Sequence, residues 1–388
     1  MKVLLLVPQS CPGDRHESVR NGTRPQADYD AVAEAVRAIR GGRADILDRN
    51  SVEQEGGWLV RLVRRLAGIN WALALLGYQR CRGYDAVMTQ SEVVGLPFAF
   101  LAATLWRRPR LVTTAFYLDG RRNAAWYRVL RIHNCIDTIF VLGREQYDIG
   151  RLQLGLPEGK LAHLDTCGYI DTAFFAATPP RTVNERQICS VGLEFRDFPT
   201  LIKAMAGLPD IKLKLDPASP WSLHQSKVGD LSIPPNVEIC HMAMGTVRSL
   251  YAESAAVVIP LLPNAIGAGR TTLVEAMAMG KPVIITKSKD NTYAGRPDII
   301  DGENVILVNQ GDGADMRRAI ERLIGDAELR RHIGANARRW AQEHAGRQQW
   351  LDVVVRALSG QAGLRNVGSE PQRENCYARG NRPGVGLK

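Results

Sequence analysis

The sequence lacks a run of about 18 uncharged apolar residues, so a membrane-spanning helix is not expected. The nearest approach, residues 93–106, is too short and contains Pro97. The amino terminus also lacks the longer apolar stretch of a secretory signal, because only Val3–Val7 precede a polar loop. These absences predict a cytoplasmic protein.

Cysteine pairs are lacking as well. The seven cysteines stand singly, none of them forms a Cys-x-x-Cys pair, and their number is odd. This pattern disfavours both a disulfide framework and a zinc site, and reduced thiols agree with a cytoplasmic chain.

What the chain does have is length and positive charge. Its 388 residues suffice for two or three domains, and 40 Arg and 10 Lys against 40 acidic residues give a net charge of +10. The excess predicts an anionic partner: nucleic acid, an anionic membrane face or a phosphorylated substrate. Because the basic residues are dispersed and no nucleic-acid-binding motif is present, a basic nucleic-acid-binding protein is kept only as an alternative.

Apolar runs alternate with helical patterns in two halves, residues 1–175 and 181–345. In the first half we expect strands at 2–7, 44–48, 85–89, 110–114 and 138–142, and in the second at 187–192, 211–215, 237–240, 256–259, 282–286 and 305–308. Such alternation predicts the α/β class with a doubly wound parallel sheet in each half. Residues 359–388 are rich in Gly, Asn, Arg and Pro and are expected to form a disordered tail.

The segment 264–283 carries the strongest chemical signal. Gly267 and Gly269 let the backbone approach a ligand closely, and Thr271 and Thr272 are expected to open a helix beside Arg270. Free amides, hydroxyls and a guanidinium at a helix N-terminus make a cradle for a diphosphate.

Glu275 has two interpretations. We place it in the first turn of that helix, where its carboxylate could accept the two hydroxyls of a ribose. Alternatively, Thr272-x-x-Glu275 is a capping box with a purely structural role.

The stretch Glu275-Ala-Met-Ala-Met-Gly-Lys-Pro-Val283 resembles the donor-site motif of GT-B glycosyltransferases, specifically family 4 (group 1). Agreement in order and spacing continues through residues 139–345, whereas residues 1–138 share only the architecture. The resemblance implies two Rossmann-like domains facing a cleft. It further implies an acceptor site in residues 1–175, a donor site in 181–345, and a helix near 346–358 that crosses back to the first domain.

The same resemblance implies transfer of a sugar from a nucleotide-diphosphate donor to a glycan, glycolipid or small-molecule acceptor, with no cofactor besides the donor substrate. The family usually carries two glutamates eight positions apart; here Gly267 stands at the first and Glu275 at the second. Leu193 follows Gly192 where the family usually has Arg, and Arg196 stands in for a usual Lys. Retention of the anomeric configuration is implied, with inversion kept open by these departures.

Side chains can be assigned to this chemistry. We expect Gly192, Gly267, Gly269, Thr271, Thr272 and Glu275 to bind the donor, and Arg196 and Arg270 both to bind it and to neutralise the leaving diphosphate. No Asp-x-Asp motif lies in a suitable loop, so no metal is expected.

Two residues of the first half are candidate bases for the acceptor. His16 lies in the loop after the first strand, and the alternative is a surface histidine without a role. Asp119 would act only in an inverting reaction, and the alternative is a turn residue before Gly120.

Residues 58–76 place Arg61, Arg64 and Arg65 among apolar residues at helical spacing. Such a helix can lie on an anionic membrane, which would make the protein peripheral on the inner membrane face, or it can pack as an ordinary domain helix. Among enzymes, a GT-B nucleotide-sugar 2-epimerase is the alternative to a transferase.

Overall fold

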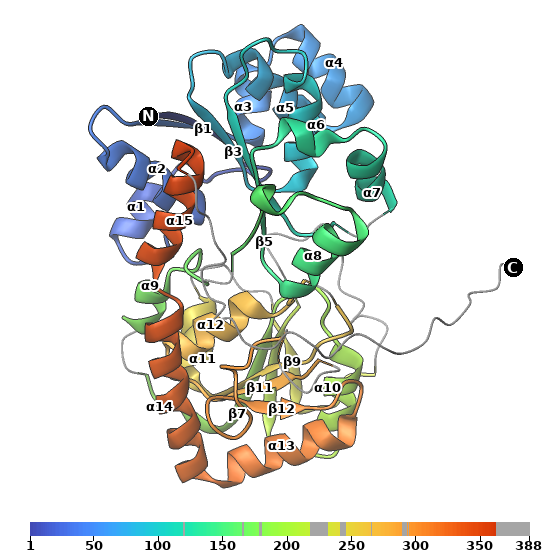
Figure 1. Cartoon of the computed structure of the whole chain (residues 1–388). Coiled ribbons are helices and arrows are strands. Elements are labelled where there is room, and N and C mark those ends of the chain that lie inside the picture. Colours follow the sequence, from blue (N-terminus) through green and yellow to red (C-terminus); the bar gives the residue numbers. More distant parts are fainter. Residues whose placement is uncertain are drawn as a thin grey trace, which may run out of the picture.

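The computed structural model describes residues 1–118, 121–164, 167–177, 181–217, 232–240, 246–264, 266–288, 293 and 295–361. These residues form two α/β lobes, an upper one from the N-terminal half and a lower one from the C-terminal half (Figure 1). Each lobe contains a six-stranded parallel sheet.

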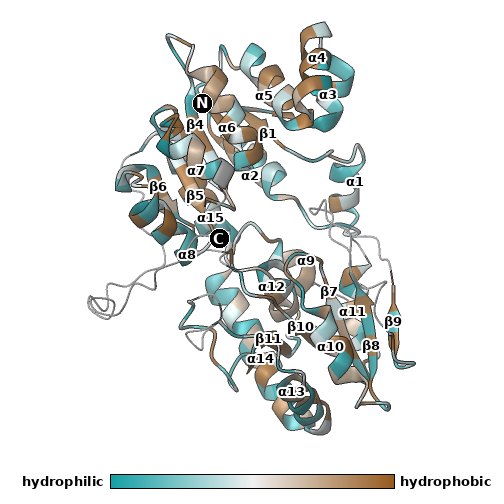
Figure 2. Cartoon of the chain, turned by 90° about the vertical axis from the view of Figure 1, so that its right-hand side faces the viewer, coloured by the Kyte–Doolittle hydropathy of each residue, from teal (hydrophilic) through white to brown (hydrophobic). Residues whose placement is uncertain are grey.

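The first sheet has the strand order β2-β1-β3-β4-β5-β6. Its strands are β1 (Lys2–Leu6), β2 (Arg43–Leu47), β3 (Ala86–Thr89), β4 (Arg110–Ala115), β5 (Thr138–Val141) and β6 (Leu161–His163). Val3–Leu6 are buried on both faces of β1, as expected for a central strand covered by helices on each side. The strands carry mainly hydrophobic residues (Figure 2).

The helices of the first half fill the connections of this sheet, except the last of them, whose Phe174 and Phe175 join the core of the second half. They are α1 (Arg15–Arg20), α2 (Asp28–Ala38), α3 (Arg49–Glu55), α4 (Trp58–Ala67), α5 (Ile69–Arg80), α6 (Glu92–Ala102), α7 (Arg121–Arg128), η1 (Ile132–Cys135), α8 (Arg144–Asp148), η2 (Ile149–Gln153), η3 (Glu158–Lys160) and α9 (Thr172–Ala176). Among the helices that the structure describes, none is long and apolar enough to cross a membrane.

The second sheet has the order β12-β11-β10-β7-β8-β9. Its strands are β7 (Asn184–Val191), β8 (Lys212–Asp216), β9 (Val237–Ile239), β10 (Ser254–Ile259), β11 (Val283–Thr286) and β12 (Ile306–Val308). The helices are α10 (Phe198–Met205), α11 (Val247–Glu253), α12 (Arg270–Ala278), α13 (Gly313–Gly325), α14 (Ala327–His344) and α15 (Arg347–Ser359). Two parallel doubly wound sheets confirm the predicted fold class.

The last helix, α15, follows the second sheet in the sequence but packs on the first half of the molecule. α15 runs beside α2, and Trp350, Val353 and Val354 join the core that Val3 and Leu5 of β1 form (Figure 1). The C-terminal end of the described chain is therefore anchored on the first sheet.

One predicted helix is wrong. Residues 58–76 form two helices, because Gly68 adopts φ +89° between α4 and α5, a conformation that disfavours any residue with a Cβ. Ala72–Gly77 of α5 are buried, whereas only Val60 of α4 is. The apolar residues of the segment therefore belong partly to the core and partly to the surface. Of the expected tail, residues 362–388 lie outside the described residues.

Candidate functional site

The strand order of the second sheet reverses between β7 and β10. In open parallel sheets, ligands bind beyond the carboxyl ends of the strands at such a reversal. The loop after β7 and the loop after β10 meet there: the Asp197 amide donates to the Pro260 carbonyl (3.1 Å), and the Leu262 amide donates to the Phe195 carbonyl (2.8 Å). We call this carboxyl end of β7 and β10 the C-terminal switch edge.

Arg196 fastens the first of these loops. Its guanidinium donates to the carbonyl oxygens of Val191 (3.2 and 3.1 Å) and Glu194 (3.0 Å) and to Thr272 Oγ1 (3.1 Å). These bonds occupy four of its five N–H groups. Burial lowers the pKa of Arg196, with neighbouring Tyr293, Tyr251 and acidic groups opposing that shift.

Gly192 is required by this arrangement. It has φ +104°, and a Cβ there would lie 2.6 Å from Arg196 Nη2. Phe195 also has a positive φ of 52°, which is costly for an aromatic residue. The loop is thus held in a strained shape around one guanidinium.

The glycine-rich turn after β10 is held from two sides. Asn264 Oδ1 accepts from the Ala268 amide (2.8 Å), and the Tyr293 hydroxyl lies 3.1 Å and 3.0 Å from the carbonyl oxygens of Gly267 and Ala268. Gly269 has φ +87°, and a Cβ there would approach Ile259 Cγ2 to 2.9 Å. The turn therefore needs glycine at 269, and Tyr293 sets the direction of its carbonyls.

The N-terminus of α12 is open. Gly269 is its N-cap, no side chain caps it, and no acidic residue stands in its first turn. Arg270, the first helical residue, is only 5% exposed, yet its Nε and Nη1 have no hydrogen-bond partner among the residues that the structure describes. Burying an unpaired guanidinium is costly, and a helix N-terminus attracts anions. This combination fits a phosphate group.

Glu275 lies in the second turn of α12, one turn later than predicted. Its carboxylate accepts a hydrogen bond from the Tyr251 hydroxyl of α11 (3.0 Å). Burial raises the pKa of Glu275 to about 7, against the opposing effects of Tyr251 and Arg196.

The capping-box interpretation of Thr272 and Glu275 is wrong. The N-cap is Gly269, so Thr272 is the third helical residue instead of the cap. Its hydroxyl accepts from Arg196. The two side chains thus face the loop after β7 and the helix α11, and neither caps α12.

Of the two candidate bases, only His16 lies within the described residues. His16 is exposed on α1 in the other half of the molecule. Asp119 lies outside the described residues. Their roles stay predictions.

Sequence reasoning missed the polar residues at the corresponding edge of the first sheet. Its strand order reverses between β1 and β3, and Gln9 and Gln90 follow these strands. Gln9 Nε2 donates to Gln90 Oε1 (3.2 Å), and Gln90 Nε2 donates to Asp28 Oδ1 (2.6 Å). We call this carboxyl end of β1 and β3 the N-terminal switch edge.

Glu92, which begins α6 after β3, is buried nearby. Its carboxylate accepts the backbone amides of Phe116 (3.0 Å) and Tyr117 (3.2 Å), and burial raises its pKa. The Gln90-Ser91-Glu92 cluster between an apolar strand and an apolar helix was the signal that could have identified it.

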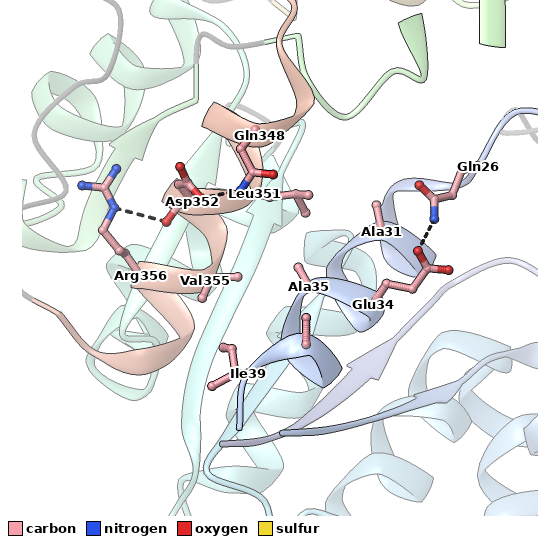
Figure 3. A pocket seen from close by; sticks show the side chains of 11 residues that line it. Gln26, Ala31, Glu34, Ala35, Ile39, Gln348, Leu351, Asp352, Val355 and Arg356 are labelled. Atoms are coloured by element: carbon pink, nitrogen blue, oxygen red, sulfur yellow. Dashed lines mark hydrogen bonds between the residues drawn. The ribbon is translucent and has the colours of Figure 1, made fainter. Parts of the chain in front are cut away.

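A separate hollow of about 850 Å³ lies between α2 and α15 (Figure 3). Its polar side chains bond to one another: Gln26 Nε2 donates to Glu34 (2.7 Å), and Gln348 Nε2 donates to Asp352 (2.8 Å). They leave little capacity for a ligand. In the part of the chain that the structure describes, no three His, Cys, Asp or Glu side chains gather as metal ligands would.

The fold is of the GT-B type, and comparisons with known proteins agree. Sucrose-phosphate synthase of Thermosynechococcus elongatus superposes with a TM-score of 0.65 at 17% identity over 93% of this chain and 99% of that one. HepE of Anabaena, solved with UDP and glucose, has a TM-score of 0.58 at 16% identity over 92% and 99%. These identities show the fold alone.

Sequence comparison narrows the class. Residues 197–326 match the model of the family "Glycosyl transferases group 1", which confirms the resemblance to group 1 glycosyltransferases over the segment that carries Arg270 and Glu275. The lipopolysaccharide core biosynthesis glycosyltransferase LpsE of Rhizobium meliloti (strain 1021) is 28% identical over 169 residues. That match spans 43% of this chain and 47% of LpsE.

Proposed function

We propose that this chain is a glycosyltransferase that takes its sugar from a nucleotide-diphosphate donor bound at the C-terminal switch edge. The observation that carries the proposal is Arg270, a buried guanidinium with open N–H groups at an uncapped helix N-terminus. A diphosphate supplies the negative charge and the acceptor oxygens that this site lacks. The family match of residues 197–326 supports the same activity.

In the reaction, the bond between the anomeric carbon and the diphosphate oxygen breaks, and a bond from that carbon to an acceptor hydroxyl oxygen forms. The proton of that hydroxyl passes to an oxygen of the leaving diphosphate or to a candidate base, His16 or Asp119, and the diphosphate leaves with the electron pair of the broken bond. Arg270 and the first amides of α12 stabilise the charge that grows on the diphosphate. Arg196 fixes the facing loop and adds positive charge beside Thr272.

Glu275 is assigned to the ribose. As a carboxylate it can accept both ribose hydroxyls, while Tyr251 keeps it oriented. The acceptor would bind at the N-terminal switch edge, where Gln9, Asp28 and Gln90 offer hydrogen bonds to a hydroxylated molecule. His16 and Asp119 remain candidate bases, and retention remains the implied outcome.

The relatives suggest which substrates to test first. HepE was solved with UDP and with UDP-glucose, and LpsE is named for lipopolysaccharide core biosynthesis. We therefore propose a UDP-hexose donor and a saccharide acceptor. An anionic membrane surface stays a proposed partner, since glycolipid acceptors lie at such surfaces, but the proposed transfer reaction does not depend on it.

A thermal-shift panel of UDP-, GDP-, ADP- and dTDP-sugars and a CMP-sugar tests the donor site. A ligand at about 100 times its dissociation constant should stabilise the native state by roughly 2.7 kcal/mol. The selected donor is then incubated with and without saccharide acceptors. Acceptor-dependent release of the nucleoside diphosphate supports the proposal, and NMR of the product gives the anomeric configuration. Epimerised donor without acceptor would instead indicate a 2-epimerase, and no binding of any nucleotide sugar would refute the proposal.

A further inference from the structure

Helix α4 carries large apolar side chains on its outer surface. Trp58 is 76% exposed, Leu59 39%, Leu62 44% and Leu66 77%. Trp58, Leu62 and Leu66 recur at intervals of four residues and therefore lie on one side of the helix. We call these four residues the α4 face.

The exposed apolar side chains belong to α4 and not to the neighbouring helix α5. α5 follows after the single residue Gly68, and its Ala72–Leu76 are buried in the core of the first half. α4 contributes only Val60, fully buried, and Val63, partly buried, to that core. Val60 and Val63 thus attach α4 to the core, and among the residues that the structure describes none covers the α4 face.

The charges of α4 have one sign. Its sequence, residues 58–67, contains Arg61, Arg64 and Arg65 and no acidic residue. All three arginines are exposed. Arg61 donates to the Gly56 carbonyl (3.0 Å), and Arg64 pairs with Glu53 of α3 at 2.9 Å in a solvent-exposed bridge that contributes little.

We infer that the α4 face docks on a bilayer containing anionic lipids, with its apolar side chains among the acyl chains and its arginines at the headgroups. A tryptophan at one end of an amphipathic helix favours the membrane–water interface. Each basic residue near an anionic surface contributes about 1 kcal/mol, and this attraction falls with salt. A neutral protein partner would gain less from three exposed arginines.

A second aromatic group lies on other helices of the first half. Trp71 of α5, Phe100 of α6 and Trp126 of α7 contact one another with ring centroids 5.8–6.2 Å apart. Phe100 is exposed, and α5 packs against both α4 and α6.

The test is flotation of the full chain with vesicles of phosphatidylcholine alone or of phosphatidylcholine with phosphatidylglycerol. We expect binding to the anionic vesicles only, weakening as salt rises. The double variant Leu62→Ser/Leu66→Ser should reduce the partition coefficient at least about tenfold, because each buried CH₂ contributes about 0.8 kcal/mol. Both residues are exposed, so the variant should fold.

This variant keeps the net charge of the protein, so its loss of binding cannot be attributed to non-specific attraction by the +10 charge. Leu152→Ser is the matched control, since Leu152 is 83% exposed on η2, outside α4. The inference is overturned if neither vesicle binds at low salt, or if the double variant floats like the parent. Self-association that the double variant abolishes, without lipid binding, would assign the face to a second copy instead. Nucleotide-sugar binding does not enter any of these outcomes, so the proposed enzymatic function can fail independently.

Discussion

The two switch edges have the same architecture and opposite chemistry. At the C-terminal switch edge, the loops after β7 and β10 bring together Arg196 and Arg270. At the N-terminal switch edge, the loops after β1 and β3 bring together Gln9, Gln90 and Asp28. Sheet topology places both edges, but loop residues decide which edge can attract an anion.

The edges also differ in how well their buried charges are paired. The Glu92 carboxylate in the first half accepts two backbone amides, which completes its hydrogen bonding within the protein. Arg270 in the second half leaves Nε and Nη1 unpaired although it is buried. A buried charge whose hydrogen bonds are made within the protein stabilises the fold, whereas one with unpaired donors has them left for a ligand.

Replacing Arg270 tests this difference most severely. In Arg270→Met we expect donor-dependent turnover to fall by about 10²–10³-fold, the loss typical of one transition-state donor. The free energy of unfolding of the unliganded protein should stay equal or rise, because an unpaired buried charge is removed. Steady-state kinetics and urea unfolding measure the two effects.

Arg330→Met is the matched control for that variant. Arg330 is also largely buried in the second half, but it donates to the carbonyls of Leu323 (3.0 Å) and Ile324 (2.6 Å). Its replacement should lower stability and leave the kinetics unchanged. Equal losses of stability in both variants would mean that Arg270 is an ordinary structural arginine.

The pKa of Glu275 gives the C-terminal switch edge a pH dependence. Because its folded pKa of about 7 lies above the usual value of 4.5, the folded state holds a proton that the unfolded state releases. Stability should therefore fall as pH rises from about 4.5 to about 7, by at most about 1.4 kcal/mol per pH unit. Urea unfolding of the parent and of Glu275→Gln across this range measures the difference.

Donor binding should respond in the opposite direction. The ribose needs the carboxylate form, so affinity should increase through pH 7 in the parent and not in Glu275→Gln. Protonation of the nucleotide phosphates affects binding to both proteins equally, so it cancels when their pH profiles are compared. Parallel pH profiles would remove Glu275 from the ribose site.

Glu92→Ala tests the N-terminal half, where the buried carboxylate is paired within the protein. It leaves the amides of Phe116 and Tyr117 without an acceptor, and we expect the free energy of unfolding to fall by about 1–3 kcal/mol. Nucleotide affinity should not change, because Glu92 belongs to the other half. A loss of nucleotide affinity without a loss of stability would contradict the division between the two edges.

Tyr293→Phe should have the smallest effect. It removes the hydroxyl that contacts the Gly267 and Ala268 carbonyls but keeps the ring. The lost hydrogen bond contributes about 0.5–1.5 kcal/mol. We expect a higher KM for the donor with little change in kcat. Tyr78→Phe, which loses only an exposed contact with Thr104, controls for the substitution. Indistinguishable kinetics would show that the turn keeps its shape without Tyr293.

Much of the fold was predictable because central strands of parallel sheets are apolar on both faces. Lys2–Leu6 and Val283–Thr286 match their predicted strands closely for this reason. The break at Gly68 was missed, since the helical pattern continues across it and only the positive φ reveals it. β6, three residues long, offers too short a pattern to detect.

The candidate site was predicted in position but not in pairing. Spacing placed Arg196 and Arg270 after strands of the same sheet, and parallel topology brings such ends together. Spacing could not show that the carbonyls of its own loop bind Arg196, because this pairing depends on the positive φ of Gly192 and Phe195. Nor could spacing show that Arg270 is left unpaired. Spacing also suggested Thr272 as an N-cap, whereas its hydroxyl accepts a hydrogen bond from Arg196.

Calorimetric titration of the nucleoside diphosphate selected by the thermal-shift panel into the parent, Arg270→Met and Arg330→Met tests the central claim most directly. If Arg270 is the group that the diphosphate completes, Arg270→Met should lose at least about tenfold in affinity, as expected for charge-assisted hydrogen bonds. Arg330→Met should bind like the parent. An Arg270→Met protein that is folded and binds within about twofold of the parent would contradict a diphosphate site at the N-terminus of α12.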